Sequence, residues 1–214
     1  MADATRDGPF ADAAQREHAA RLGLWVFLAS EALLFAGLLA LYAACRAQHP
    51  RAFAEGVTHA TRALGAINTG VLLTSSYAVA ASVHALRRGR RGLSLALLGV
   101  TVAMGAGFLA IKFTEYARHV HEGIEPGGRG RFFAAHTDPG LATFWTLYYT
   151  TTGLHAVHVT VGALVLVWLW GRVAFGRSRD ASRALSLGAT YWHFVDLVWI
   201  FVWPLYYLLG GAAP

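Results

Sequence analysis

Five long apolar segments constrain this chain more than any other feature of its sequence. They cover residues 22–45, 64–86, 93–116, 141–171 and 184–209. A membrane core about 30 Å thick needs a helix of about 20 apolar residues, so each segment is long enough to cross it. The apolar residues run continuously and do not alternate with polar ones, which excludes a membrane β-barrel. Because backbone groups that face lipid must be hydrogen-bonded within their own segment, each run is expected to be helical.

The overall composition agrees with a protein that lives in a membrane. Hydrophobic residues make up 56% of the chain and charged residues 14%, compared with about 25% charged residues in soluble globular proteins. The formal net charge is +6, but the arginines flank the apolar runs, where they can meet anionic lipid headgroups. The sequence has no basic stripe with interleaved aromatic residues, which is the pattern that would indicate nucleic-acid binding. The predicted fold is therefore an all-α integral membrane protein, a bundle of five transmembrane helices.

The distribution of arginines predicts how this bundle is oriented. Residues 1–21 form a predicted cytoplasmic tail, residues 22–209 the five-helix domain, and residues 210–214 a short C-terminal tail. The side that holds the N-terminal tail, the second-to-third loop and the fourth-to-fifth loop carries more arginines than the opposite side. Since positively charged loops stay in the cytoplasm, the N-terminus is expected there and the C-terminus outside. A bacterial-type cytoplasmic (inner) membrane is the expected location of this multi-pass chain.

Small residues repeat at a helical spacing in the second and third segments. In membranes, such residues let helix backbones approach one another closely. We expect helix packing at six positions, which are Gly70, Thr74, Ala78, Gly99, Ala103 and Gly107.

Three polar residues lie deep inside apolar segments, where lipid would exclude them. Glu31 is about 15 Å into its helix at 1.5 Å per residue, so its carboxyl should face the protein interior. It could handle protons, organise lipid, or act as a hydrogen bond between helices. His155 and His158 are three residues apart and share one helix face. With a glutamate from another helix they could bind a metal, but the ligand set is too small, and we expect no metal site.

Two further polar pairs have the same spacing of three residues. His193 and Asp196 are expected to partner each other, or one of the first two histidines, and so to join the fourth and fifth segments. Lys112 and Glu115 are expected to form an ion pair at the outer end of the third helix, where such a pair could fix the depth of the helix. No arrangement of residues indicates nucleophilic catalysis, and no catalytic residue is predicted.

Four sequence elements together resemble a known family. They are GLWVFLASE at 23–31, TGLHAVHV at 152–159, WHFVDLVW at 192–199, and Phe108-Leu109 followed by Glu115-Tyr116. In this order they resemble subunit III of haem–copper terminal oxidases, the cytochrome c oxidase subunit III family, in a short five-helix form. The similarity covers residues 22–209.

The resemblance implies a subunit without a redox centre of its own. Such a subunit binds phospholipid, supports proton uptake, and stabilises the catalytic subunit of a proton-translocating complex during aerobic electron transport. Haem and copper would lie in partner subunits I and II. By this resemblance Glu31 matches the family carboxyl that reacts with hydrophobic carbodiimides. His155 and His158 match the family's paired histidines, and His193 and Asp196 match its last motif.

Departures from the longer family form leave alternatives open. The longer form has seven spans, and this chain lacks the first two. Ala156 stands where the family often has glycine, while Lys112 and the short loop at 123–133 are similar to subunit III-like proteins of quinol oxidases and nitric oxide reductases. A proton-coupled transporter is an alternative of another class. Transporters tend to have interrupted helices, and Pro204 is the single proline inside these segments.

Overall fold

A computed structural model describes residues 13–176 and 178–210, and within this part the chain is helical with no strand. Five helices are long and apolar enough to cross a membrane, which confirms the predicted fold class. In order along the chain, the helices are α1 (Ala13–Gln48), α2 (Pro50–His59), α3 (Arg62–Arg87), α4 (Arg91–Glu122), α5 (Arg131–Ala135), α6 (Pro139–Phe175) and α7 (Ser178–Tyr207).

The helices extend beyond the apolar segments that predicted them. α1 already begins at Ala13, so the described part of the predicted tail belongs to this helix, while residues 1–12 and 211–214 lie outside the described residues. α4 continues to Glu122, where an Arg118–Glu122 pair of 2.9 Å bridges its last turn. It ends at Gly123, whose φ of 84° is in the left-handed region that glycine tolerates best. Because the helix ends carry charged residues, the apolar runs alone do not show where the helices end.

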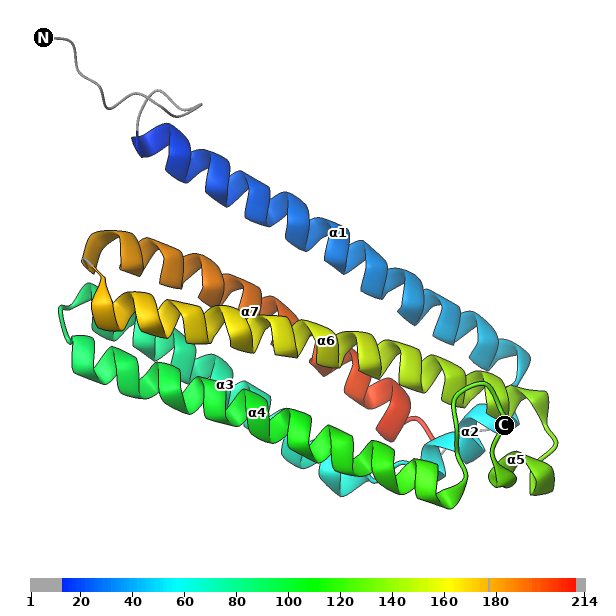
Figure 1. Ribbon diagram of the computed structural model, residues 1–214. Coiled ribbons are helices and arrows are strands. Elements are labelled where there is room, and N and C mark those ends of the chain that lie inside the picture. The colour runs from blue at the N-terminus through cyan, green and yellow to red at the C-terminus, as the bar shows by residue number, and fades with distance from the viewer. Residues whose placement is uncertain (1–12, 177, 211–214) are drawn as a thin grey trace, which may run out of the picture.

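Helices α3, α4, α6 and α7 form a four-helix bundle. α3 packs on α4 and α7, while α6 packs on the other sides of the same two helices. α1 contacts α6 and α7 along a smaller interface and runs obliquely to them in Figure 1. The short helix α2 packs against α6, with the Phe53 and Phe144 rings 5.4 Å apart.

One tryptophan of α7 fills the centre of this bundle. Trp192 is fully buried, and its indole Nε1 donates to the Ser75 hydroxyl of α3 at 3.0 Å. Its ring lies against two glycines, Gly105 of α4 and Gly162 of α6. A Cβ at these positions would come within 2.7 Å and 2.9 Å of ring atoms. A single side chain on α7 therefore packs against the other three helices of the bundle.

Most of the small residues predicted for helix packing lie outside the contacts between helices. Ala78 is buried, but Gly70, Thr74, Gly99 and Ala103 are exposed and Gly107 is half-buried. A Cβ added at any of the three glycines would meet no neighbour within 4 Å. That prediction is wrong for contacts within this chain, because the large Trp192 ring requires the space at Gly105 and Gly162.

Candidate functional site

One polar contact joins α1 to α6 in the middle of the membrane-spanning region. His158 Nε2 lies 2.9 Å from Glu31 Oε2, and the two side chains are 12% and 18% exposed. The other ring nitrogen, Nδ1, lies 2.8 Å from the Leu154 carbonyl oxygen. A carbonyl oxygen can only accept, so Nδ1 must carry a proton. The Nε2–Oε2 bond then holds one more proton, either on a neutral carboxyl or on a cationic imidazole.

Aromatic residues surround this pair. The Phe35 ring of α1 lies 5.1 Å from the His158 ring in an edge-on arrangement, and the Tyr191 hydroxyl donates to the His158 carbonyl oxygen at 3.2 Å. The pair therefore lies beside aromatic residues of α1 and α7, while part of its surface remains exposed.

His155 occupies a different environment although it lies one helical turn away. Its ring is fully buried between Trp199 and Phe108, at centroid distances of 5.0 Å and 5.5 Å. Neither of its ring nitrogens has a hydrogen-bond partner among the described residues. The structure thus brings Glu31 and His158 into direct contact, whereas His155 points into the bundle.

Lys112 and Glu115 form a pair, as the sequence suggests, but the pair is inside the bundle. The lysine Nζ donates to Glu115 at 2.9 Å, to the Tyr148 hydroxyl at 3.0 Å and to the Tyr207 hydroxyl at 2.9 Å. Tyr207 in turn donates to the Glu115 carboxylate. The expectation of a boundary pair is wrong because two tyrosines, from α6 and α7, supply the hydrogen bonds that make burial possible. No pattern near Lys112 in the sequence points to them.

His193 and Asp196 do not bond to each other. His193 Nδ1 lies 2.6 Å from the Ser76 hydroxyl of α3. Asp196 is 3% exposed and lies near the same hydroxyl, but neither carboxyl oxygen has a hydrogen-bond partner in the described chain. The predicted link between α6 and α7 is therefore wrong. Both side chains lie toward α3, because residues three apart share one helix face and this face of α7 packs on α3.

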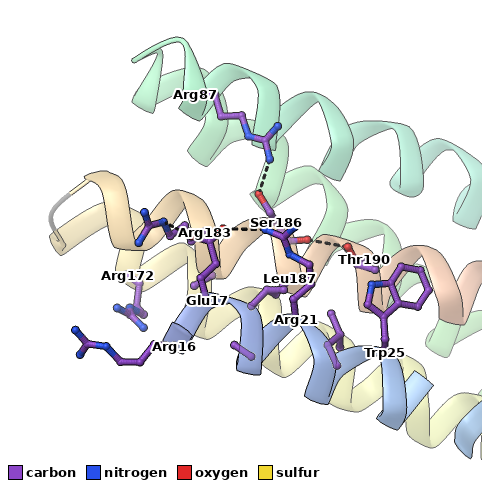
Figure 2. Close-up of a pocket in the computed structure, with 13 residues that line it drawn as sticks. Arg16, Glu17, Arg21, Trp25, Arg87, Arg172, Arg183, Ser186, Leu187 and Thr190 are labelled. Carbon is purple, nitrogen blue, oxygen red and sulfur yellow. Dashed lines mark hydrogen bonds and ion pairs between the residues drawn. The ribbon is translucent and has the colours of Figure 1, made fainter. Parts of the chain in front are cut away.

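A pocket of about 880 Å³ opens where α1 begins. Figure 2 shows that α1, α3, α6 and α7 all contribute arginines to it. Glu17 of α1 bridges two of them, accepting from Arg21 at 2.9 Å and meeting Arg183 of α7 at 3.4 Å. In the sequence these arginines only flank the apolar runs and indicate orientation; they do not reveal the pocket, because they come from distant segments. Within the described residues, no group of three or more His, Cys, Asp or Glu side chains could hold a metal ion.

Comparisons with known proteins agree on one family. The family model described as cytochrome c oxidase subunit III matches residues 1–211. The probable quinol oxidase subunit 3 of Staphylococcus saprophyticus is 31% identical over 92% of this chain and 93% of its own length. The cytochrome c oxidase subunit 3 of Bacillus subtilis is 32% identical over 88% and 86%. The cytochrome bo(3) ubiquinol oxidase subunit 3 of Pseudomonas aeruginosa is 28% identical over 88% of this chain and 84% of its own length.

Proposed function

Because this chain belongs to the cytochrome c oxidase subunit III family, we propose that it is the non-redox subunit of its oxidase, beside subunits I and II that carry the haem and copper. The chain is subunit III of a haem–copper terminal oxidase, as its relatives and its five spanning helices show. The transporter alternative has no support, since the match to an oxidase family covers nearly the whole chain.

The parent complex can be identified by purification. A tagged chain, solubilised gently from its own membrane, should bring down partners with haem absorbance. A colourless preparation would contradict the proposal. The relatives carry the names of both quinol oxidases and a cytochrome c oxidase, so oxygen uptake should be measured with a quinol and with reduced cytochrome c. Nitric oxide consumption tests the remaining alternative.

We place the N-terminus in the cytoplasm and the complex in a bacterial inner membrane. The arginine pocket at the start of α1 supports this orientation, since positive charge gathers on the cytoplasmic side. A reporter enzyme that is active only outside the cytoplasm, fused after residue 214, should be active. An inactive fusion would reverse the orientation.

Proton handling by the Glu31–His158 contact is the activity that this chain's own residues support best. A carboxyl and an imidazole that share a proton at 2.9 Å can accept a proton on one group and release it from the other. Both side chains are partly exposed, so they are not sealed inside the chain. The contact also lies well away from either helix end of α1, deep in the span.

Replacement of Glu31 by Gln should test this role. The amide keeps a hydrogen-bonding side chain but cannot take up a proton, so the complex should assemble while its proton uptake during turnover slows. Glu122→Gln is a matched control, because Glu122 forms an exposed pair at the end of α4. Equal uptake in the two variants would remove Glu31 from the proposal.

Phospholipid is the remaining ligand that we propose. Outside its contacts with α6 and α7, α1 exposes large apolar side chains. They include Trp25, Val26, Leu33 and Leu34. Acyl chains would cover these side chains in a membrane, and the gentle purification described above should retain lipid.

A further inference from the structure

The short helix α5 lies at the same end of the molecule as α2, where α1 ends (Figure 1). Both short helices are outside the five spanning helices. Hydrogen bonds to backbone carbonyl groups hold α5 to the end of α4. The Phe132 N–H donates to the Gly123 carbonyl oxygen at 3.3 Å, and the Arg131 guanidinium donates to the His121 carbonyl oxygen. On its other side α5 meets α2 through side chains that can titrate.

His136, the residue that follows α5, is placed so that only its charged form can bond to α2. Its Nδ1 lies 2.9 Å from the Phe132 carbonyl oxygen, and a carbonyl oxygen only accepts, so Nδ1 carries a proton. In the neutral ring Nε2 then has a lone pair, and it lies 3.7 Å from Glu55 Oε1 of α2. A carboxyl ordinarily loses its proton at a lower pH than an imidazole. A neutral ring and a carboxylate are thus two acceptors, whereas a protonated Nε2 donates to the carboxylate.

The ring of Phe132 also favours the charged form of His136. The two rings are stacked, with centroids 4.1 Å apart and an angle of 11° between their planes. A positive charge over the face of an aromatic ring is attracted by its π-electrons. Protonation of one imidazole therefore adds an attraction between α5 and α2 and strengthens a second contact within α5.

Glu55 and His59 of α2 both face this imidazole, and they act in opposite directions. The His59 ring lies 6.3 Å from the His136 ring and 5.1 Å from the Phe132 ring. Its charged form would repel a charged His136, so Glu55 supplies the attraction. On the side of α6, the Asp138 carboxylate caps that helix and accepts from a backbone N–H at 2.8 Å.

We infer that His136 and Glu55 form a pH-sensitive latch between α5 and α2, which closes when the imidazole gains a proton. An imidazole with an unperturbed pKa of about 6.5 changes its charge between about pH 5 and 8. The latch is therefore closed on the acidic side of this range and opens as the pH rises. The inference rests on the proposed orientation at one point only: in that orientation the latch senses the pH outside the cytoplasm.

The latch acts on the helix that has the smallest interface with the bundle. α2 follows α1 after a single residue, His49, and α5 is bonded to α4. A closed latch therefore ties the end of α1 to the bundle. Other links of α1 include the Glu31–His158 contact and the bond from the Tyr42 hydroxyl to a carbonyl oxygen of α7. Acidification adds a further link to the helix that carries Glu31.

Hydrogen exchange of the α5 amides tests the latch. The full chain, solubilised with the subunits that accompany it, is exchanged at about pH 8 and at about pH 5.5. The rates for residues 131–137 are divided by the intrinsic rates at each pH. Protection should rise about two- to fivefold at the lower pH, as expected for one partly exposed ion pair. A salt concentration of about 1 M should reduce this gain, because salt screens exposed charges.

Variants assign the gain in protection to the two residues. His136→Phe keeps a ring that can stack but has no titrating nitrogen, and Glu55→Ala removes the carboxylate. Each variant should abolish the gain, and the double variant should lose nothing more, because both remove the same interaction. His59→Gln and Glu122→Gln are matched controls for an imidazole and a carboxylate at the same end of the molecule, and both should retain the gain.

Three results would overturn the inference. They are absence of a gain in the unmodified chain, a gain that survives in His136→Phe or Glu55→Ala, and loss of the gain in either control. Detergent exposes both faces of the protein, so the result does not depend on orientation. Co-purification of haem and the reporter fusion are scored separately, so failure of the latch and failure of the proposed function are distinguishable.

Discussion

Lys112 and Glu115 form an ion pair of 2.9 Å whose two side chains are each about 1% exposed. Hydroxyl groups of Tyr148 and Tyr207 complete the coordination of the ammonium group. Two charges can remain in an apolar interior only when they are paired and hydrogen-bonded in this way. The pair therefore joins α4 to α6 and α7 through hydrogen bonds that exist only when all three helices are in place.

Removal of one charge from this pair should destabilise the bundle strongly. Glu115→Gln leaves the Lys112 ammonium buried without its counter-ion, and loss of one partner from a buried pair costs about 3–5 kcal/mol. The free energy of unfolding in detergent measures this cost. The double variant Lys112→Met, Glu115→Gln should be less damaging than Glu115→Gln alone, since no uncompensated charge remains.

The Arg118–Glu122 pair on the same helix is the matched control. It has the same 2.9 Å separation, but its side chains are 55% and 39% exposed. Exposed pairs contribute little because water and salt screen them. If Glu122→Gln were as destabilising as Glu115→Gln, burial would not be the reason for the cost.

Substitution of the two glycines beside Trp192 should separate true packing positions from exposed ones. Gly105→Ala places a methyl group 2.7 Å from the indole ring, and such overpacking costs about 1–3 kcal/mol. Gly162→Ala should behave alike. Gly99→Ala on the same helix meets no neighbour within 4 Å and should leave stability unchanged or raise it, because alanine favours the helix. Equal effects at Gly99 and Gly105, measured by thermal unfolding, would contradict the central role of Trp192.

These glycines show where sequence reasoning reaches its limit. Apolar runs predicted all five spanning helices, because lipid imposes length and continuity on each helix by itself. Spacing alone cannot reveal which face of a helix meets a partner, since that depends on a large side chain such as Trp192 from a segment far away in sequence. For the same reason Lys112 and Glu115 were recognised as a pair, while Tyr148 and Tyr207 were not.

The sequence also predicts part of the polar site that Glu31 and His158 form. Glu31 and His158 were grouped as one site, and they lie in contact although 127 residues separate them. Depth in the membrane carried that inference, because a carboxyl so far from water needs a polar partner. His155 was grouped with them on helix spacing, yet one turn of α6 is enough to turn its ring toward Trp199.

Asp196→Leu should stabilise the bundle, although a link between α6 and α7 would have predicted the opposite. The Asp196 carboxyl is 3% exposed, and the Ser76 hydroxyl beside it is already engaged by His193 Nδ1 at 2.6 Å, so neither carboxyl oxygen has a well-formed hydrogen bond within the described chain. Leucine branches at the same atom without polar groups but is larger, so the gain of about 1–3 kcal/mol from removing an unpaired buried polar group must exceed the crowding cost of the extra volume. A loss of stability in chemical unfolding would show that Asp196 has a partner in the folded protein.

Carbodiimide labelling should distinguish Glu31 from Glu115, two carboxyl groups that lie inside spanning helices beside a basic partner. A hydrophobic carbodiimide dissolves in the membrane and reacts with a protonated carboxyl that it can reach. Glu31 is 18% exposed and shares a proton with His158, whereas Glu115 is 1% exposed and accepts hydrogen bonds from Lys112 and Tyr207. Mass spectrometry of the labelled chain should therefore find the adduct on Glu31 and not on Glu115. Labelling of Glu115 in preference to Glu31 would mean that the contact between α4, α6 and α7 around Lys112 opens more readily than the α1–α6 contact.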